Sequence, residues 1–369
     1  MFFKKHIITA SGSLSSVAWK KFKKNFLGLG SLIFIGITAM IALLGYLITP
    51  DSTPYANDQY LELGLKKPGF SVMMLPVRDR VVHKSSPFYK TMIWGTVKNL
   101  QNIPIRTCSN VKNRVYYIEY GAMPGDPSMV NTLPLNMVEI PVRKTFWLGT
   151  DRFGRDYLSQ MMIGTRVSLS VGLISVIISL VIGIFMGAVG GYYRGWVDNV
   201  IVWLINVIWS IPTLLLVIAI TFALGKGFWQ VFIAVGLTMW VEVARVVRGQ
   251  ILGIREKEYV EAARALGFSD FRIIFHHILP NVMAAVIVIS AANFASAILM
   301  EAGLSFLGLG VQPPVPSWGS MIKENYGYIV LDYAYLAVLP GIAIMLMVLA
   351  FMLMGNALRD ALDVRMSEV

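Results

Sequence analysis

The side chains that could carry chemistry in this chain are few, and they form no catalytic pattern. His276 and His277 are adjacent, so on a helix they point about 100° apart, whereas a shared metal favours histidines four residues apart. The only cysteine is Cys108, which leaves no partner for a disulfide within the chain. No nucleotide-binding Gly-x-x-x-x-Gly-Lys-Ser/Thr loop, Ser/His/Asp arrangement or carboxylate pair is present. The sequence therefore predicts no catalytic residue, no metal site and no cofactor held by this chain.

The polar stretch with the clearest internal order is 258–280, which interrupts the apolar second half of the chain. Its first part has apolar residues at helical spacing and ends at Gly267, which favours a left-handed helix stop. Ser269 is placed to cap a second helix, and Pro280 is expected to close it. The apolar stripe of that second helix is Phe271, Ile274, Phe275 and Ile278. We expect two short helices separated by a break.

The elements that must position this stretch are those of a membrane protein. Hydrophobic residues make up 56% of the 369 residues and charged residues 14%, and the mean hydropathy is +0.64. Soluble domains lie nearer 45–50% and 25%. The net charge is +11, but the cations flank apolar runs, as in membrane proteins with basic cytoplasmic loops. This pattern favours contact with lipid and excludes a nucleic-acid-binding face.

Six stretches are apolar and long enough to cross a bilayer, which takes about 20 residues. They are 25–50, 167–189, 199–224, 228–241 extended to about 244, 281–300 and 333–358. Pro212 is expected to kink the third stretch. Lysines before the first stretch and arginines after the last favour cytoplasmic N- and C-termini. The predicted fold class is an all-α integral membrane protein with about six transmembrane helices.

The chain divides into regions of different composition. Residues 1–24 form a basic cytoplasmic segment and 25–50 the first transmembrane helix. Residues 51–145 have no spanning run and contain short β-like pieces, so we expect a folded extracytoplasmic insertion between the first two helices. Residues 146–369 form the core, with five transmembrane helices. Its loop 245–280 is rich in arginine, which places this loop in the cytoplasm.

A second ordered string precedes the second span, at residues 147–156. Thr150 or Asp151 is placed to cap a helix, and Asp151 and Arg155 are spaced as i,i+4 partners. We expect an amphipathic segment at the membrane interface. The polar and glycine residues of this string are Gly149, Thr150, Asp151, Gly154, Arg155 and Asp156.

Three separated strings resemble one family. Glu261-Ala262-Ala263, Gly267 and Ile278-Leu279-Pro280 are similar to the EAA loop of ABC importer permeases, although His277 replaces the usual isoleucine. The Gly-Thr-Asp-x-x-Gly-Arg-Asp string and the Pro-Pro-x-Pro-x-Trp-Gly string at 313–319 resemble the dipeptide/oligopeptide/nickel branch of that family. The resemblance covers the first span and the chain from about residue 145 onward.

The resemblance implies a multi-pass permease subunit of the cytoplasmic (inner) membrane that translocates di- or oligopeptides. The implied partners are a second homologous permease subunit, two ABC ATPase subunits that bind the ATP, and an extracytoplasmic solute-binding protein. The EAA loop would act as a cytoplasmic coupling helix that docks on an ATPase subunit. The implied ATPase-coupling residues are Tyr259, Glu261, Ala262, Ala263, Gly267, Leu279 and Pro280.

Some alternatives stay open at this point. Glu301 ends the fifth span, and a carboxylate at membrane depth marks either a gate or pathway position, or else a structural ion pair or an interface position. A nickel or other small-solute importer of the same family has the same features. A secondary transporter would carry charged residues within its spans as ion sites, and the six spans are almost free of them. An exporter or insertion factor would share the topology but not the EAA spacing.

Overall fold

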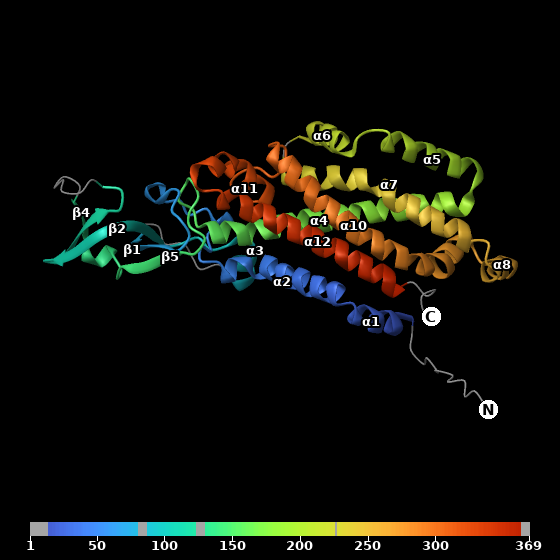
Figure 1. Cartoon of the computed structure of the whole chain (residues 1–369), viewed down its shortest axis with the longest axis horizontal. Helices are drawn as coiled ribbons and strands as arrows, with labels where there is room; N and C mark the ends of the chain where they lie inside the picture. The colour runs from blue at the N-terminus through green and yellow to red at the C-terminus, as the bar shows by residue number, and fades with distance from the viewer. Residues whose placement is uncertain (1–13, 80–86, 123–129, 226, 363–369) are drawn as a thin grey trace, which may run out of the picture.

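The computed structural model describes residues 14–79, 87–122, 130–225 and 227–362, as a helical bundle with a small sheet at one end (Figure 1). Within these residues, five helical stretches are long and apolar enough to cross a membrane. They are α2 (Phe26–Ile48), α4 (Tyr157–Tyr193), α7 (Phe228–Ile254), the stretch Asp270–Phe306 that ends in α10 (Leu279–Phe306), and α12 (Tyr335–Leu362). The prediction of several apolar helices long enough to cross a membrane is confirmed.

The third predicted span is broken rather than kinked. It consists of α5 (Gly195–Trp209) and α6 (Thr213–Leu224), whose axes differ by 92°, so the structure has up to six spans if this pair counts as one. Pro212 precedes α6 and cannot donate a backbone hydrogen bond, while its ring clashes with the preceding turn. The chain nevertheless returns through this pair from the α8 end of the bundle to the start of α7 (Figure 1).

The fifth span begins earlier than predicted, because the expected stop at Pro280 does not occur. A short α-turn, α9 (Asp270–Arg272), leads into a π-helical turn at Ile273–Ile278 and then directly into α10. Pro280 lies in the first turn of α10, where its missing N–H costs little. Ser269 does occupy the predicted cap position, but its side chain makes no capping hydrogen bond.

The insertion is mainly a β-sheet, with one short helix and a few 3₁₀ turns, so the all-α class is wrong for this region. Among the described residues it forms a five-stranded antiparallel sheet in the order β4-β3-β2-β1-β5. The strands are β1 (Phe70–Arg78), β2 (Leu100–Val111), β3 (Arg114–Glu119), β4 (Val130–Pro134) and β5 (Val142–Phe146). Lys112 and Asn113 both have positive φ, which is typical of the two-residue hairpin turn that joins β2 to β3. The β-like sequence at 114–118 is confirmed as β3.

Short helices mark the two ends of the bundle. Near the sheet lie α3 (Phe88–Trp94) and α11 (Trp318–Asn325), and at the opposite end lie α1 (Leu14–Lys24) and α8 (Glu258–Ala265) (Figure 1). The described ends of the chain, at α1 and the end of α12, lie at the same end as α8. Single 3₁₀ turns occur at Pro54–Ala56, Leu61–Leu63, Leu135–Met137 and Tyr326–Leu331.

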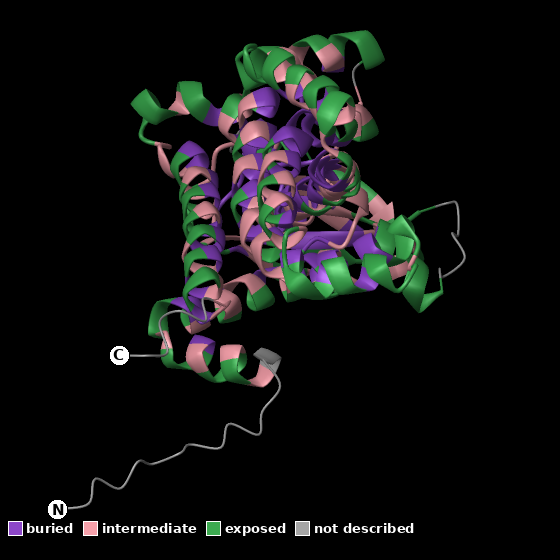
Figure 2. Ribbon diagram, turned by 90° about the vertical axis from the view of Figure 1, so that its right-hand side faces the viewer, coloured by how far each residue is buried: buried purple, intermediate pink, exposed green. Residues whose placement is uncertain are grey.

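Small residues bring α4 and α7 into backbone contact at the centre of the bundle. A Cβ added at Gly187 would lie 2.6 Å from the carbonyl oxygen of Ala244, and one at Gly183 would lie 2.7 Å from that of Trp240. Such close approach favours van der Waals packing between helices where lipid supplies no hydrophobic driving force. In Figure 2 the buried residues gather between the helices, and the outward faces are exposed.

Candidate functional site

The predicted coupling segment is a short helix that stands at one end of the bundle. α8 spans Glu258–Ala265, and Gly267 follows with φ +79°, as predicted for a left-handed stop. Tyr259, Glu261, Ala262 and Gly267 are exposed, so they are open to a partner. Ala263 is instead 4% exposed and packs with Val260 against the inner ends of α7 and α10.

The ends of α4 and α7 that lie farthest from the sheet surround α8 and the turn that follows it. Tyr192, near the end of α4, donates a hydrogen bond of 2.6 Å to Asp270, and the guanidinium of Arg255 donates to the Tyr192 carbonyl. The Arg264 guanidinium lies 5.2 Å from the centre of the Tyr192 ring. Asp198 accepts two hydrogen bonds, of 2.5 and 2.7 Å, from Arg248. Arg264 thus connects α8 to α4, while Arg255 connects the end of α7 to α4, and the Arg248–Asp198 pair joins α7 to α5.

The other predicted coupling residues lie in the fifth span. Leu279 is partly buried and lines an apolar cavity of about 440 Å³ beside α4, while Pro280 is exposed. His277 stacks on Phe268 with ring centres 5.8 Å apart, which is a packing role. In the part of the chain that the structure describes, no three potential metal ligands come together.

The signature residues at 149–156 form a buried turn just before α4. Asp151 and Arg155 make the predicted i,i+4 ion pair, with Oδ2 and Nε 2.6 Å apart. The other carboxylate oxygen of Asp151 accepts hydrogen bonds from the backbone N–H groups of Phe153 and Arg155. The expected cap at Thr150 or Asp151 is wrong, because the chain turns again at Gly154 and Asp156 caps α4 by accepting from the Ser159 N–H at 2.8 Å.

This turn is hydrogen-bonded to, and closely packed against, the segment that follows α2. Thr150 donates a 2.5 Å hydrogen bond to the Leu63 carbonyl and accepts one of 2.8 Å from the Lys66 N–H. Gly149 and Gly154 both have positive φ, and a Cβ at either would collide with the carbonyl oxygen of Lys66 or Tyr60. Both glycines are thus needed for conformation and for close approach. We call this turn, residues 149–156, the clasp, because it fixes the segment after α2 to the start of α4.

The clasp also joins three helices at the end of the bundle that lies next to the sheet. Arg155 donates to Glu324 on α11 at 2.9 Å and to Asn57 in the clasped segment at 3.4 Å. The Tyr157 hydroxyl, in the first turn of α4, donates to the Leu336 carbonyl on α12. The i,i+4 spacing predicted the pairing of Arg155 with Asp151, but Glu324 is distant in the chain and no local pattern pointed to it.

Glu301 is fully buried between helices and has hydroxyl partners. One carboxylate oxygen accepts from Ser305 at 2.6 Å and the other from Ser168 on α4 at 3.3 Å. Ser317, which caps α11, donates to the Ser305 hydroxyl at 3.3 Å. Within the described chain Glu301 makes no ion pair, so the expected structural ion pair is replaced by a hydroxyl network.

Sequence reasoning missed the position of Glu242. The predicted fourth span ran just past this residue to about residue 244, but α7 continues to Ile254, so Glu242 lies about 21 Å along the helix from Phe228 and well before its end. Its side chain is exposed on this chain, although a carboxylate at membrane depth is costly unless it meets water or protein. A single acid within an apolar run was the signal that could have located it.

Two family models match the sequence. Residues 179–368 match the family described as binding-protein-dependent transport system inner membrane component. Residues 13–68 match the N-terminal TM domain of oligopeptide transport permease C. The two matches together include α2, the clasped segment after it and most of the helical bundle with α8.

Named relatives show the same similarity. The glutathione transport system permease protein GsiD of Pectobacterium atrosepticum is 42% identical over 217 residues, covering 59% of this chain and 72% of the relative. The dipeptide transport system permease protein DppC of Alkalihalophilus pseudofirmus is 40% identical, covering 65% and 78%. Among solved structures, the inward facing MetNI methionine ABC transporter overlaps with a TM-score of 0.47 at 18% identity, covering 56% of this chain and 97% of that chain.

Proposed function

Because this chain belongs to the binding-protein-dependent transport system inner membrane component family, it is a multi-pass inner-membrane permease subunit, and we propose that it imports di- or oligopeptides with separate ATPase subunits supplying the energy. The observation that supports the substrate class is the similarity to permeases named for glutathione and dipeptide transport, at 42% and 40% identity. The family implies ATPase and solute-binding partners. We propose two ATPase subunits, a second homologous permease subunit and one extracytoplasmic binding protein.

We propose that α8 and both chain ends face the cytoplasm and that the sheet lies outside. α8, α1 and the end of α12 share one end of the bundle, opposite the sheet (Figure 1). α1 carries Lys20, Lys21, Lys23 and Lys24, and the loop around α8 is rich in arginine. Basic residues at one end of the bundle favour the cytoplasmic side. The ATPase subunits would then bind at α8 and the binding protein near the sheet.

In this proposal α8 transmits the movement of an ATPase subunit to the bundle. Its exposed residues Tyr259, Glu261 and Ala262 form the docking face, while Val260 and Ala263 fix the helix to the inner ends of α7 and α10. Leu279 and Pro280 lie where the π-helical turn enters the fifth span, so they would receive the movement rather than contact the ATPase. Coupling requires that ATPase binding differ in free energy between the inward-facing and outward-facing states.

The place of a second permease is supported by the uncovered polar face of α7. Glu242 and Gln250 lie on this face, and Gln250 lines a groove of about 650 Å³ with Asn281, Ala285 and Arg359. Polar and small residues at membrane depth are expected where a helix faces protein or a water-filled path. We therefore propose that this face, rather than the buried Glu301, borders the translocation pathway between the two permeases.

The test of the proposed function is uptake by cells that lack this chain, with peptide and nickel uptake measured in parallel. We expect di- or oligopeptide uptake to be lost and nickel uptake to be unchanged. Loss of nickel uptake alone would assign the chain to a nickel importer of the same family. Peptide uptake that continued without ATPase subunits would indicate a secondary transporter.

Replacing Gly267 by valine should uncouple ATP hydrolysis from transport. A β-branched residue in the left-handed region costs about 1–2 kcal/mol, and nothing lies within 4 Å of the added Cβ, so the effect comes from the backbone alone. A change of this size shifts a conformational equilibrium roughly 5–30-fold. We expect the rate of peptide uptake to decrease by roughly 5–30-fold while the chain remains inserted in the membrane. Gly267→Asn is the control, because asparagine tolerates this conformation and should keep uptake near normal.

A further inference from the structure

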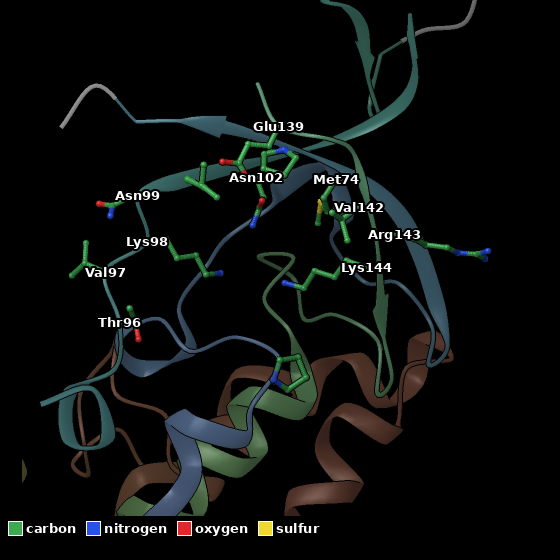
Figure 3. A pocket seen from close by; sticks show the side chains of 13 residues that line it. Met74, Thr96, Val97, Lys98, Asn99, Asn102, Glu139, Val142, Arg143 and Lys144 are labelled. Carbon is green, nitrogen blue, oxygen red and sulfur yellow. The ribbon is translucent and has the colours of Figure 1, made fainter. Parts of the chain in front are cut away.

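A cavity of about 850 Å³ lies beside the sheet (Figure 3). It lies between Pro50, where α2 ends, the segment 96–100 that leads into β2, and the strands β1, β2 and β5. Met74 and Val142 supply apolar surface, and Asn102 points its amide into the space. A cavity of 300–1,000 Å³ with a few convergent polar groups is typical of a small-molecule site.

Two lysines extend into this cavity from opposite walls. Figure 3 shows Lys98, from the segment before β2, and Lys144, from β5, with their ammonium groups directed into the same space. Lys98 forms ion pairs with two carboxylates, with its Nζ 2.8 Å from Asp58 and 3.4 Å from Asp51. Burial alone would lower the pKa of Lys98, but these two carboxylates raise it above its usual value. Lys98 therefore remains charged.

Lys144 has no such direct partner. Its Nζ lies 4.9 Å from the centre of the Phe146 ring and 5.3 Å from that of Tyr60, and within the described residues no carboxylate pairs with it. Burial, and then the nearby Lys98, lower its pKa. Asp156 acts on it only from a distance and uses one oxygen to cap α4. Lys144 thus lies at the cavity wall with no paired carboxylate as a counter-charge, because Asp156, Asp51 and Asp58 raise its pKa only through longer-range attraction. A bound anion would raise this pKa and favour the charged form.

The remaining charged residues of the lining do not supply that counter-charge. Glu139 lies 3.5 Å from Arg78, and both side chains are largely exposed. Arg143 points away from the cavity (Figure 3) and donates to the Ser71 hydroxyl at 2.7 Å. The carboxylates of Asp51 and Asp58 are not part of the lining, and both pair with Lys98 and act on Lys144 only at longer range. An anion between the two ammonium groups would relieve their mutual repulsion.

We propose that this cavity binds the free carboxylate of a short peptide between Lys98 and Lys144, with the Asn102 amide as a further donor. Hydrogen bonds between an ammonium group and a carboxylate are stronger than neutral ones, and the apolar wall can contact the rest of the ligand. The carboxylate chemistry follows from the cavity itself, and only the choice of a peptide as its carrier rests on the proposed function. The cavity would hold a peptide outside the membrane, next to the end of α2.

The experiment measures binding to the purified full-length chain in lipid nanodiscs by isothermal titration calorimetry, without ATPase subunits. The probes are trialanine, trialanine amide and acetate. We expect trialanine to bind and its amide to bind at least about 10-fold more weakly, because one charge-assisted contact is lost. Lys144→Gln and Lys98→Gln should each weaken trialanine binding by about 10-fold or more. Arg143→Gln, which changes a cation that points away, should bind like the wild type.

Several outcomes would overturn this proposal. They are no binding of trialanine to the wild type, equal affinity for trialanine and its amide, and an equal loss in Arg143→Gln. Acetate that binds as tightly as trialanine would refute the peptide as the ligand. Asn102→Ala is a second lining variant, and the apparent melting temperature of each variant shows whether the fold is retained. Because no transport is measured, a negative result here leaves the uptake test of the proposed function independent.

Discussion

Replacing Arg155 by methionine is expected to destabilise the outer end of the bundle by about 3–5 kcal/mol, the range for removing one partner of a buried ion pair. The side chains of Arg155 and Asp151 are only 9% and 3% exposed, and Glu324 is 21% exposed. Without the guanidinium, two carboxylates from different elements are left in the clasp with no counter-charge. The measurement is thermal unfolding of the purified chain together with the fraction recovered as a single species.

The matched controls separate charge from geometry. Arg155→Lys keeps the charge, but one ammonium cannot reach both carboxylates as the guanidinium fork does, so most of the loss should remain. Arg152→Met removes a neighbouring exposed arginine whose guanidinium lies 4.5 Å from the centre of the Phe153 ring and forms no ion pair within the described residues, and it should change stability by less than about 0.5 kcal/mol. A stability equal to that of the wild type in Arg155→Met would show that the clasp does not hold the outer end together.

Replacing Glu301 by leucine is the second change with a large expected effect. It leaves the hydroxyls of Ser168 and Ser305 without their acceptor in a fully buried site between α4 and α10. Each buried polar group left unsatisfied costs about 1–3 kcal/mol, so we expect a total loss of about 2–6 kcal/mol. Thermal unfolding and the yield of inserted chain measure this loss.

Glu301→Gln distinguishes the two functions considered for this residue. Glutamine keeps the shape and an acceptor oxygen, so a structural network should retain most of its stability and the cells should retain peptide uptake. A gate or pathway role that needs the carboxylate would instead give a stable chain with lost uptake. If Gln and Leu were equally destabilising, the hydroxyl network would not be the reason for the burial of Glu301.

The predicted break at Gly267 and the ion pair between Asp151 and Arg155 are present in the structure. Both depend on contacts within a few residues of the chain, so the residue types and their spacing are enough to predict them. The same holds for the apolar spans, because their length and composition alone match the bilayer. The break at Pro212 could also be predicted from the sequence. The angle between the axes of α5 and α6 could not, because it depends on how α6 packs against α7.

Errors arose where one local preference competed with a longer-range arrangement. Pro280 was expected to end a helix, but the π-helical turn before it places the proline in a first turn, where its ring is tolerated. The cap of α4 was assigned to Thr150 or Asp151, but both side chains are used by the clasp and Asp156 takes that role. Similar short polar residues compete for such positions, and only the path of the chain selects among them.

The sequence by itself determined the membrane character, the position of α8 and the residues of the signature, because each depends on local composition and spacing. Only the tertiary structure decided that Ala263 packs inward while Ala262 faces outward, and that Glu301 lies among serines from two helices. It also brought Arg155 to Glu324, and Lys98 to the cavity wall opposite Lys144. These pairs are far apart in the chain, so their contact depends on how whole elements pack, which no local pattern records.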